Sequence, residues 1–190
     1  MLKNFTSFIK RTYFSYLSNN SLIHKKLYSI SIIQAYNVLK ISFDGAVFKE
    51  KGEAGIGVVV RDSHGMVIAS LAEKIQLPSS SDEVEALAAV RAVTLAMDLN
   101  LPSFIVEGDS EVVISALRKE EESFSSFGRL ISSIKHYLHS CSCISFSHTR
   151  RSSNSVAHSL AKFAKHIVDL SVWMEDVPPQ VNDVLLADYG

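Results

Sequence analysis

The order in which the apolar periodicity changes along the chain most constrains its fold. Residues 39–47 alternate apolar and polar side chains, a second such run covers 55–61, and a third covers 66–72 after a turn at Asp62-Ser-His-Gly65. Short runs of period two, separated by turn residues, are typical of strands joined as hairpins. The sequence therefore predicts three consecutive antiparallel strands at the start of the folded region.

After Pro78 the periodicity becomes helical and predicts a helix that ends near Asn100. A β-prone run follows at 104–107, then helical segments from Val112 and over 127–139, a strand at 143–148 and a final helix over 153–168. Strands that alternate with helices favour a sheet covered by helices. We expect an α/β fold with a five-stranded mixed sheet, its first three strands antiparallel, and helices on both faces.

Three acidic residues stand where predicted strands or helices begin or end. Asp44 lies in the second half of the first alternating run, Glu85 lies near the start of the first helix, and Asp109 follows the strand at 104–107. Carboxylates from separate elements can converge on a divalent cation, because hard cations prefer oxygen ligands. Asp44, Glu85 and Asp109 are therefore candidate metal ligands.

Each acid also has an ordinary structural interpretation, which the sequence leaves open. Asp44 precedes Gly45 and could close a turn. Asp82 and Glu85 have the spacing of a variant capping box at a helix start. Asp109 precedes a helix, where an N-cap aspartate is common. The joint pattern favours the metal site over three unrelated structural acids.

The order of strand aspartate, helix glutamate and strand-end aspartate, followed by Asn154-Ser-Val-Ala-His158, resembles the type 1 ribonuclease H domain. More narrowly, it resembles the plant ribonuclease H-like domains of the retroelement-related, reverse-transcriptase-like group. The resemblance covers roughly residues 39–168, and Trp173-Met-Glu-Asp-Val-Pro-Pro179 is similar to the tail of that group. It implies a ribonuclease H-like fold and a metal-dependent endonuclease that cuts the RNA strand of RNA–DNA hybrids.

The resemblance also implies roles for the acids, with two Mg²⁺ ions as cofactors. Asp44 would bridge both ions, and Glu85 with Asp109 would complete one site. The fourth ligand position, an aspartate in the family, is His158 here. Imidazole suits Mn²⁺ better than Mg²⁺. On a helix of about 100° per residue, His158 lies outside the apolar arc, so it can face the site or remain a partly exposed helix residue.

Contacts to nucleic acid are expected from Arg150, Arg151 and Asn154, which precede the last helix. His148 lies six residues before Asn154, the spacing of a mobile catalytic-loop histidine in bacterial and animal relatives; the alternative places it on a strand. Where relatives carry a basic, aromatic insertion that grips the substrate, this chain has the acidic Lys119-Glu-Glu-Glu-Ser123.

Charge is divided unevenly along the chain. Six of the 19 Lys and Arg residues and none of the 20 Asp and Glu residues precede Asp44, so residues 44–190 carry 13 basic and 20 acidic residues, a formal charge of −7. This excess of acid opposes nucleic-acid binding, although bound divalent cations would offset it. It supports a second hypothesis, a retroelement-derived domain that binds nucleic acid or protein but has little or no catalytic activity.

The chain divides into a basic extension over 1–38, a ribonuclease H-like domain over 39–168 and a C-terminal tail over 169–190. The extension has the composition of a mitochondrial or chloroplast transit peptide, and a leftover of a larger reading frame is the alternative. Without such targeting, we expect the nucleus or cytoplasm. The two cysteines, Cys141 and Cys143, form neither a disulfide framework nor a zinc motif. We expect an intracellular monomer without a membrane segment.

Overall fold

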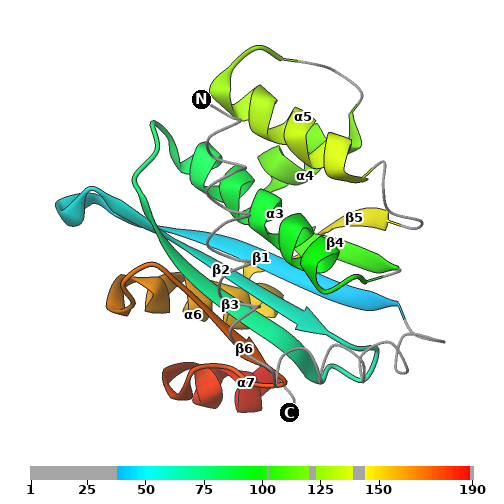
Figure 1. Cartoon of the computed structure of the whole chain (residues 1–190), viewed down its shortest axis with the longest axis vertical. Helices are drawn as coiled ribbons and strands as arrows, with labels where there is room; N and C mark the ends of the chain where they lie inside the picture. The colour runs from blue at the N-terminus through cyan, green and yellow to red at the C-terminus, as the bar shows by residue number, and fades with distance from the viewer. Residues whose placement is uncertain (1–37, 102, 120–122, 139–143, 189–190) are drawn as a thin grey trace. The chain divides into compact units, whose positions relative to one another are not determined.

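A six-stranded mixed sheet organises the protein (Figure 1). The computed structural model describes residues 38–188 except 102, 120–122 and 139–143, so residues 1–37 of the predicted N-terminal extension and both cysteines lie outside the described residues. The strand order is β5-β4-β1-β2-β3-β6. The strands are β1 (Leu39–Phe48), β2 (Glu53–Arg61), β3 (Val67–Gln76), β4 (Phe104–Gly108), β5 (Ile144–His148) and β6 (Leu170–Met174).

Helices follow the strands in the expected order. None in the described residues combines the length and apolar character needed to cross a membrane. The α-helices are α3 (Ser81–Asp98), α4 (Glu111–Arg118), α5 (Ser126–Leu138), α6 (Ser155–Phe163) and α7 (Asn182–Asp188). Short 3₁₀ turns are η1 (Lys49–Lys51), η2 (Arg151–Asn154), η3 (Ala164–His166) and η4 (Pro179–Val181).

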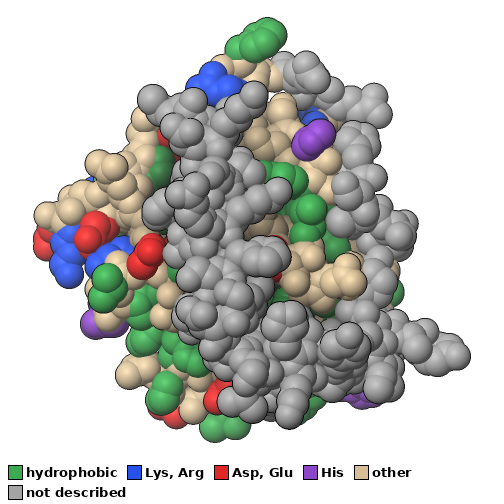
Figure 2. Space-filling view, in the orientation of Figure 1, with side chains coloured by type: hydrophobic (Ala, Val, Ile, Leu, Met, Phe, Trp, Pro, Cys, Tyr) green, Lys and Arg blue, Asp and Glu red, His purple; other side chains and the backbone are tan. Residues whose placement is uncertain are grey.

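Strand pairing confirms the predicted α/β class and the antiparallel start of the sheet. β1 pairs antiparallel with β2, and β2 with β3. On its other side β1 pairs in parallel with β4, which pairs in parallel with β5. At the β1–β2 turn, around η1, acidic and basic side chains lie close together on the surface (Figure 2).

The sequence predicts five strands, and the structure has a sixth, β6, within the predicted C-terminal tail of residues 169–190. β6 pairs antiparallel with β3, from Leu170 opposite Glu73 to Met174 opposite Ala69. The residues after it also join the core: Val177, Val181 and Leu185 are buried with Val59 and Leu160. A five-residue run directly after a helix carries little periodicity of its own, so pairing with β3 is what defines this strand.

Helices cover both faces of the sheet, as predicted. Residues on both faces of β1 are buried as a result. A Cβ on Gly45 would lie 2.8 Å from Val84 Cγ1 of α3. Asp44, one residue earlier, points to the opposite face, toward α6. Its cross-strand partner is Gly57, where a Cβ would lie 2.2 Å from the Ala157 carbonyl oxygen of α6. Glycine at position 57 therefore allows α6 to approach the sheet beside Asp44.

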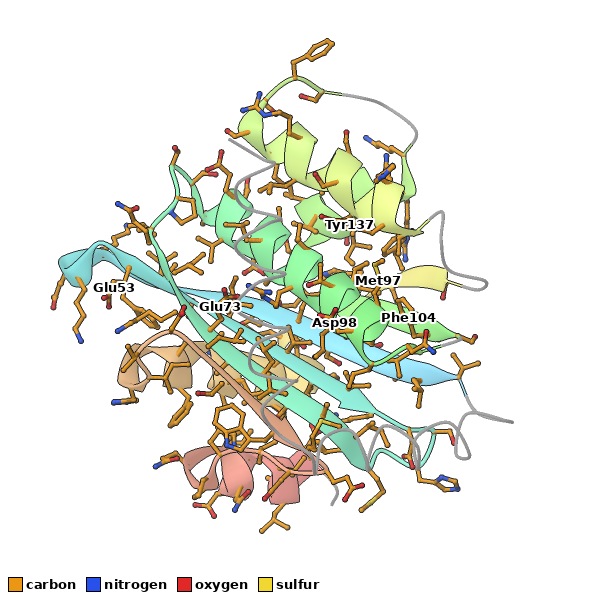
Figure 3. The ribbon with its side chains drawn as sticks, viewed as in Figure 1. Glu53, Glu73, Met97, Asp98, Phe104 and Tyr137 are labelled. Carbon is orange, nitrogen blue, oxygen red and sulfur yellow. The ribbon has the colours of Figure 1, made fainter. Side chains whose placement is uncertain are left out.

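A buried ion pair joins the sheet to α3. Glu73 on β3 (Figure 3) accepts a hydrogen bond of 2.6 Å from Arg91 Nε, and a second contact joins Arg91 Nη2 to the same carboxylate. The two residues are only 8% and 7% exposed. Because an unpaired buried charge is strongly destabilising, this pair ties α3 to β3 at one position.

Candidate metal centre

The candidate site lies where β4 ends beside β1. The last residue pair between these parallel strands joins Phe43 to Gly108, so Asp44 and Asp109 both follow directly from that pair. A Cβ on Gly108 would lie 2.5 Å from the Phe43 ring, so glycine allows the two strand segments to come together. The carboxyl ends of parallel strands are frequent ligand sites in open α/β sheets.

The three predicted acidic ligands meet at this point. Asp44 comes from β1, Glu85 from the first turns of α3, and Asp109 from the segment between β4 and α4. Each offers a carboxylate oxygen within 4.8 Å of the other two. Asp44 is fully buried, and the other two are partly buried. Asp44 lies 41 residues before Glu85, and Asp109 lies 24 residues after it, so only the folded chain brings these groups together.

The ordinary structural roles considered for these acids do not account for their positions. The capping box of α3 uses other residues: Ser80 accepts from the Glu83 amide, and Glu83 accepts from the Ser79 amide. The N-cap of α4 is Ser110, which accepts from the Val113 amide. Asp44 lies inside β1 rather than at a turn. The three acids are thus not required for the local structures that the sequence suggested.

The electrostatics of the site oppose ionisation of its carboxyl groups. Burial, followed by repulsion from Glu85 and Asp109, raises the pKa of Asp44 to about 9. Burial, followed by repulsion from Asp109, raises the pKa of Glu85 to about 7, although a hydrogen bond from the Gly45 backbone opposes the shift. Asp44 Oδ1 and Glu85 Oε2 are buried without a hydrogen-bond partner. The fold therefore holds the acids together and compensates their charge only in part.

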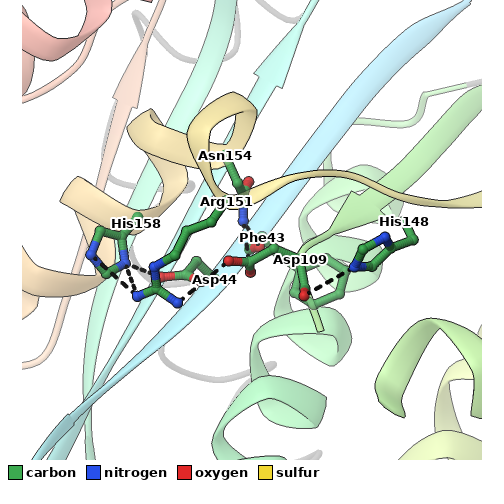
Figure 4. A network of polar contacts seen from close by, with 7 residues as sticks. All are labelled: Phe43, Asp44, Asp109, His148, Arg151, Asn154 and His158. Atoms are coloured by element: carbon green, nitrogen blue, oxygen red, sulfur yellow. Dashed lines mark hydrogen bonds and ion pairs between the residues drawn. The ribbon is translucent and has the colours of Figure 1, made fainter. Parts of the chain in front are cut away.

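His158 on α6 faces the site, as its position outside the apolar arc allows (Figure 4). Its Nδ1 lies 2.7 Å from Asp44 Oδ2 and 3.2 Å from Arg151 Nη2. Burial and then the nearby Arg151 charge lower the pKa of His158. Because a guanidinium only donates, Arg151 favours a neutral imidazole that accepts at Nδ1. The His158 tautomer decides whether the imidazole or a protonated Asp44 donates in the hydrogen bond between them.

Arg151 was expected at the nucleic-acid surface, and the structure also gives it contacts inside the site. Its Nη1 lies 3.5 Å from Asp109 Oδ2, while Nη2 lies against His158. Both arginines are exposed, and the Arg151 side chain is still 67% accessible while it makes these contacts. The sequence offered no signal that would separate these two neighbouring arginines, since only the path of η2 decides which one turns toward Asp109.

Asn154 and His148 surround Asp109. Asn154 is 1% exposed, and its Nδ2 donates to the Phe43 carbonyl oxygen at 2.9 Å and to Asp109 Oδ1 at 3.2 Å. His148 ends β5, in agreement with the interpretation that places it on a strand, and its Nε2 lies 3.2 Å from the Asp109 carbonyl oxygen. Its Nδ1 lies 3.5 Å from Glu111. Asn154 therefore fixes the Asp109 carboxylate, and His148 lies beside its backbone.

The residues present fit a hard divalent cation. Carboxylate oxygens are the ligands such cations prefer. Two of the site's oxygens, Asp44 Oδ1 and Glu85 Oε2, are buried and unpartnered. A bound cation would satisfy these oxygens and remove the repulsion that raises the two pKa values.

Comparisons with known proteins agree with this fold. A family model described as reverse transcriptase-like matches residues 42–164. Ribonuclease H1 from the halophilic archaeon Halobacterium salinarum is 24% identical with a TM-score of 0.62, covering 67% of this chain and 97% of that one. The N-terminal ribonuclease H domain of a Mycobacterium tuberculosis protein is 20% identical with a TM-score of 0.61, covering 69% and 95%.

A ribonuclease H1 from a compost metagenome, solved in complex with an RNA/DNA hybrid, is 24% identical with a TM-score of 0.59, covering 66% of this chain and 95% of that one. No curated protein matches the chain significantly. The structural likenesses extend over nearly the whole length of these enzymes, and the family model covers well over half of this chain. The chain therefore belongs to the reverse transcriptase-like family, and its fold is that of ribonuclease H.

Proposed function

We propose that this protein is a divalent-metal-dependent endonuclease that hydrolyses the RNA strand of RNA–DNA hybrids. The observation that carries the proposal is the convergence of Asp44, Glu85 and Asp109, whose carboxylate oxygens lie within 4.8 Å of one another. The hybrid bound by the compost-metagenome ribonuclease H1 indicates the class of substrate to test. Mg²⁺ is the expected cofactor, with Mn²⁺ as the alternative that the His158 imidazole favours.

The carboxylates of Asp44, Glu85 and Asp109 would hold the cation. When bound, a divalent cation neutralises charge on the scissile phosphate and promotes ionisation of water. In the reaction, a water oxygen forms a bond to phosphorus, the bond from phosphorus to the 3′ oxygen breaks, and that oxygen takes up a proton. The products are a 5′-phosphate and a 3′-hydroxyl, as the family resemblance implies.

Residues around the carboxylates would position them and the substrate. Asn154 keeps Asp109 directed at the site through its amide. Arg150 is exposed next to the site and can contact a backbone phosphate, as Arg151 can with the part of its side chain that remains exposed. His148, on the other side of Asp109, is a candidate helper in proton transfer or product release. The acidic excess of residues 44–190 predicts modest affinity that falls as salt rises.

A binding domain that has lost most catalysis is the second candidate. It is favoured by His158, which stands where the family has a carboxylate and so removes one negative charge from the site. The close approach of His158 to Asp44 favours the nuclease, because all four predicted positions share one site.

The test is cleavage of a labelled RNA–DNA hybrid by the full chain, in Mg²⁺ and separately in Mn²⁺, with double-stranded DNA as the comparison substrate. We expect cutting of the hybrid's RNA strand, loss of at least 10²-fold in Asp44→Asn, and a gain in His158→Asp. Glu50→Gln, at an exposed acid in η1, is the matched control.

The outcomes separate the two candidates. Cutting that survives Asp44→Asn would refute the carboxylate site. Hybrid binding without cutting in either metal would favour the binding domain, and restoration of cutting by His158→Asp would then locate the defect at the fourth ligand position.

A further inference from the structure

The guanidinium of Arg151 stands beside the fourth ligand position of the site. It lies 3.2 Å from His158 Nδ1 through Nη2 and 3.5 Å from Asp109 Oδ2 through Nη1 (Figure 4). It also reaches the carboxyl groups electrostatically, since its charge opposes the rise in pKa at both Asp44 and Glu85. Arg151 thus supplies positive charge on the side of the site where His158 replaces the family's carboxylate.

The two oxygens of Asp44 face different surroundings. Oδ2 is 2.7 Å from His158 Nδ1. Oδ1 has no partner, and neither does Glu85 Oε2. A cation that joins the unpartnered oxygens would contact Asp44 through Oδ1. Oδ2 faces His158, and the Arg151 guanidinium beside that imidazole carries a fixed charge and cannot act as a ligand.

The charges decide how many cations the site can hold. Three ionised carboxylates and one arginine sum to −2 when His158 is neutral, which one divalent cation balances. A second divalent cation would leave an excess of positive charge and would have to displace Arg151 from Asp109. In the pattern that the family resemblance implies, four carboxylates sum to −4, which two divalent cations balance.

We propose that Arg151 takes the place of a second metal ion, so that this centre binds a single divalent cation through Asp44, Glu85 and Asp109. This inference rests on the metal site of the proposed function, and it changes the two ions implied by the family resemblance to one ion and one side chain. The number of bound ions would then depend on two residues: Arg151, which supplies positive charge at the edge of the site, and His158, which supplies no negative charge at the fourth position.

The experiment counts Mn²⁺ bound to the full-length chain, by electron paramagnetic resonance of the free ion during titration. We expect one ion per wild-type chain and one in His158→Asp, because the new carboxylate pairs with Arg151. The double variant Arg151→Gln, His158→Asp should bind two. Arg151→Gln alone should bind one ion about tenfold more tightly, because a like charge near the ion is removed.

Two variants act as controls. Arg151→Lys keeps the charge and should bind Mn²⁺ as the wild type does. Arg150→Gln removes the neighbouring exposed charge and should change neither the number of ions nor their affinity. A gain in affinity in Arg150→Gln as large as in Arg151→Gln would overturn the inference, because the effect would then come from surface charge in general.

The remaining outcomes separate this inference from the proposed function. Two ions in the wild type, two in His158→Asp alone, or one in the double variant would overturn the role of Arg151 and leave the carboxylate site intact. No bound ion in any form would overturn both.

Discussion

Replacing Asp44 by Asn should stabilise the protein in the absence of metal and abolish its stabilisation by metal. Asp44 is fully buried, and burial with the repulsion of Glu85 and Asp109 raises its pKa from 3.8 to about 9. At pH 7.5 the folded chain must therefore keep a proton on a group that ionises freely when unfolded. Asparagine has nearly the same shape and no charge, so it avoids this penalty.

The magnitude follows from the displacement of the pKa. Each pH unit between the assay pH and the unfolded pKa corresponds to about 1.4 kcal/mol, so protonating Asp44 at pH 7.5 costs about 5 kcal/mol. Water entry and small side-chain shifts reduce this cost, and we expect a gain of about 2–4 kcal/mol in the free energy of unfolding of metal-free Asp44→Asn. For a domain of this size, that corresponds to a Tm higher by roughly 5–12 °C.

The assay is thermal unfolding with and without Mn²⁺. The wild type should gain about 2.7 kcal/mol at a Mn²⁺ concentration of 100 times Kd, and Asp44→Asn should gain nothing. Asp62→Asn is the control, because Asp62 accepts hydrogen bonds of 2.9 Å from the His64 and Met66 amides in a turn. Asp62→Asn should leave the stability of the metal-free protein nearly unchanged, because the asparagine oxygen can accept both hydrogen bonds. A loss of stability in metal-free Asp44→Asn would refute the reasoning, since the carboxylate would then be satisfied by the fold itself.

Three further predictions concern pH and packing. Mn²⁺ affinity should rise about tenfold per pH unit between pH 7 and 9, because Asp44 must release a proton to bind the ion; an affinity that stays constant in isothermal titrations over this range would contradict this. The stability of the metal-free protein should fall as pH rises above about 4, since the folded state holds protons that the unfolded chain has lost. Gly57→Ala should lower the free energy of unfolding by about 2–3 kcal/mol in urea, because the new Cβ would meet the Ala157 carbonyl oxygen at 2.2 Å; an unchanged midpoint would contradict this close packing of α6. Arg91→Met should lower the free energy of unfolding by about 3–5 kcal/mol, because it leaves the buried Glu73 carboxylate unpaired. The double variant Arg91→Met, Glu73→Gln should regain much of this free energy in urea unfolding; no regain would show that the loss comes from packing.

The alternating runs of the first three strands could be predicted from sequence because each strand's pattern is local. Ile41 and Phe43 mark one face of β1 and Asp44 the other, and the structure agrees, with Phe43 buried and Asp44 directed at α6. The first helix was likewise predicted from periodicity after Pro78, and α3 ends at Asp98, close to the expected Asn100. Both features follow from the spacing of apolar residues along one segment, because that spacing decides which side chains can be buried together on one face.

The sixth strand could not be predicted in the same way. Leu170–Met174 pairs with β3, nearly a hundred residues earlier in the chain, and its burial pattern is intermediate throughout. Nothing local distinguishes such an edge strand from an extended tail, because its hydrogen bonds depend on a partner far away in sequence.

For the candidate site, the sequence by itself determined which residue types could take part: three carboxylates, a histidine at the fourth position and two neighbouring arginines. Tertiary structure alone decided that carboxylate oxygens of Asp44, Glu85 and Asp109 lie within 4.8 Å of one another. It also decided that Ser80 and Ser110 rather than the acids cap the helices, and that Arg151 is the arginine that contacts Asp109. The physical reason is that residue type and periodicity are properties of a segment, whereas convergence and charge balance depend on where β1, α3, β4 and α6 end relative to one another in space.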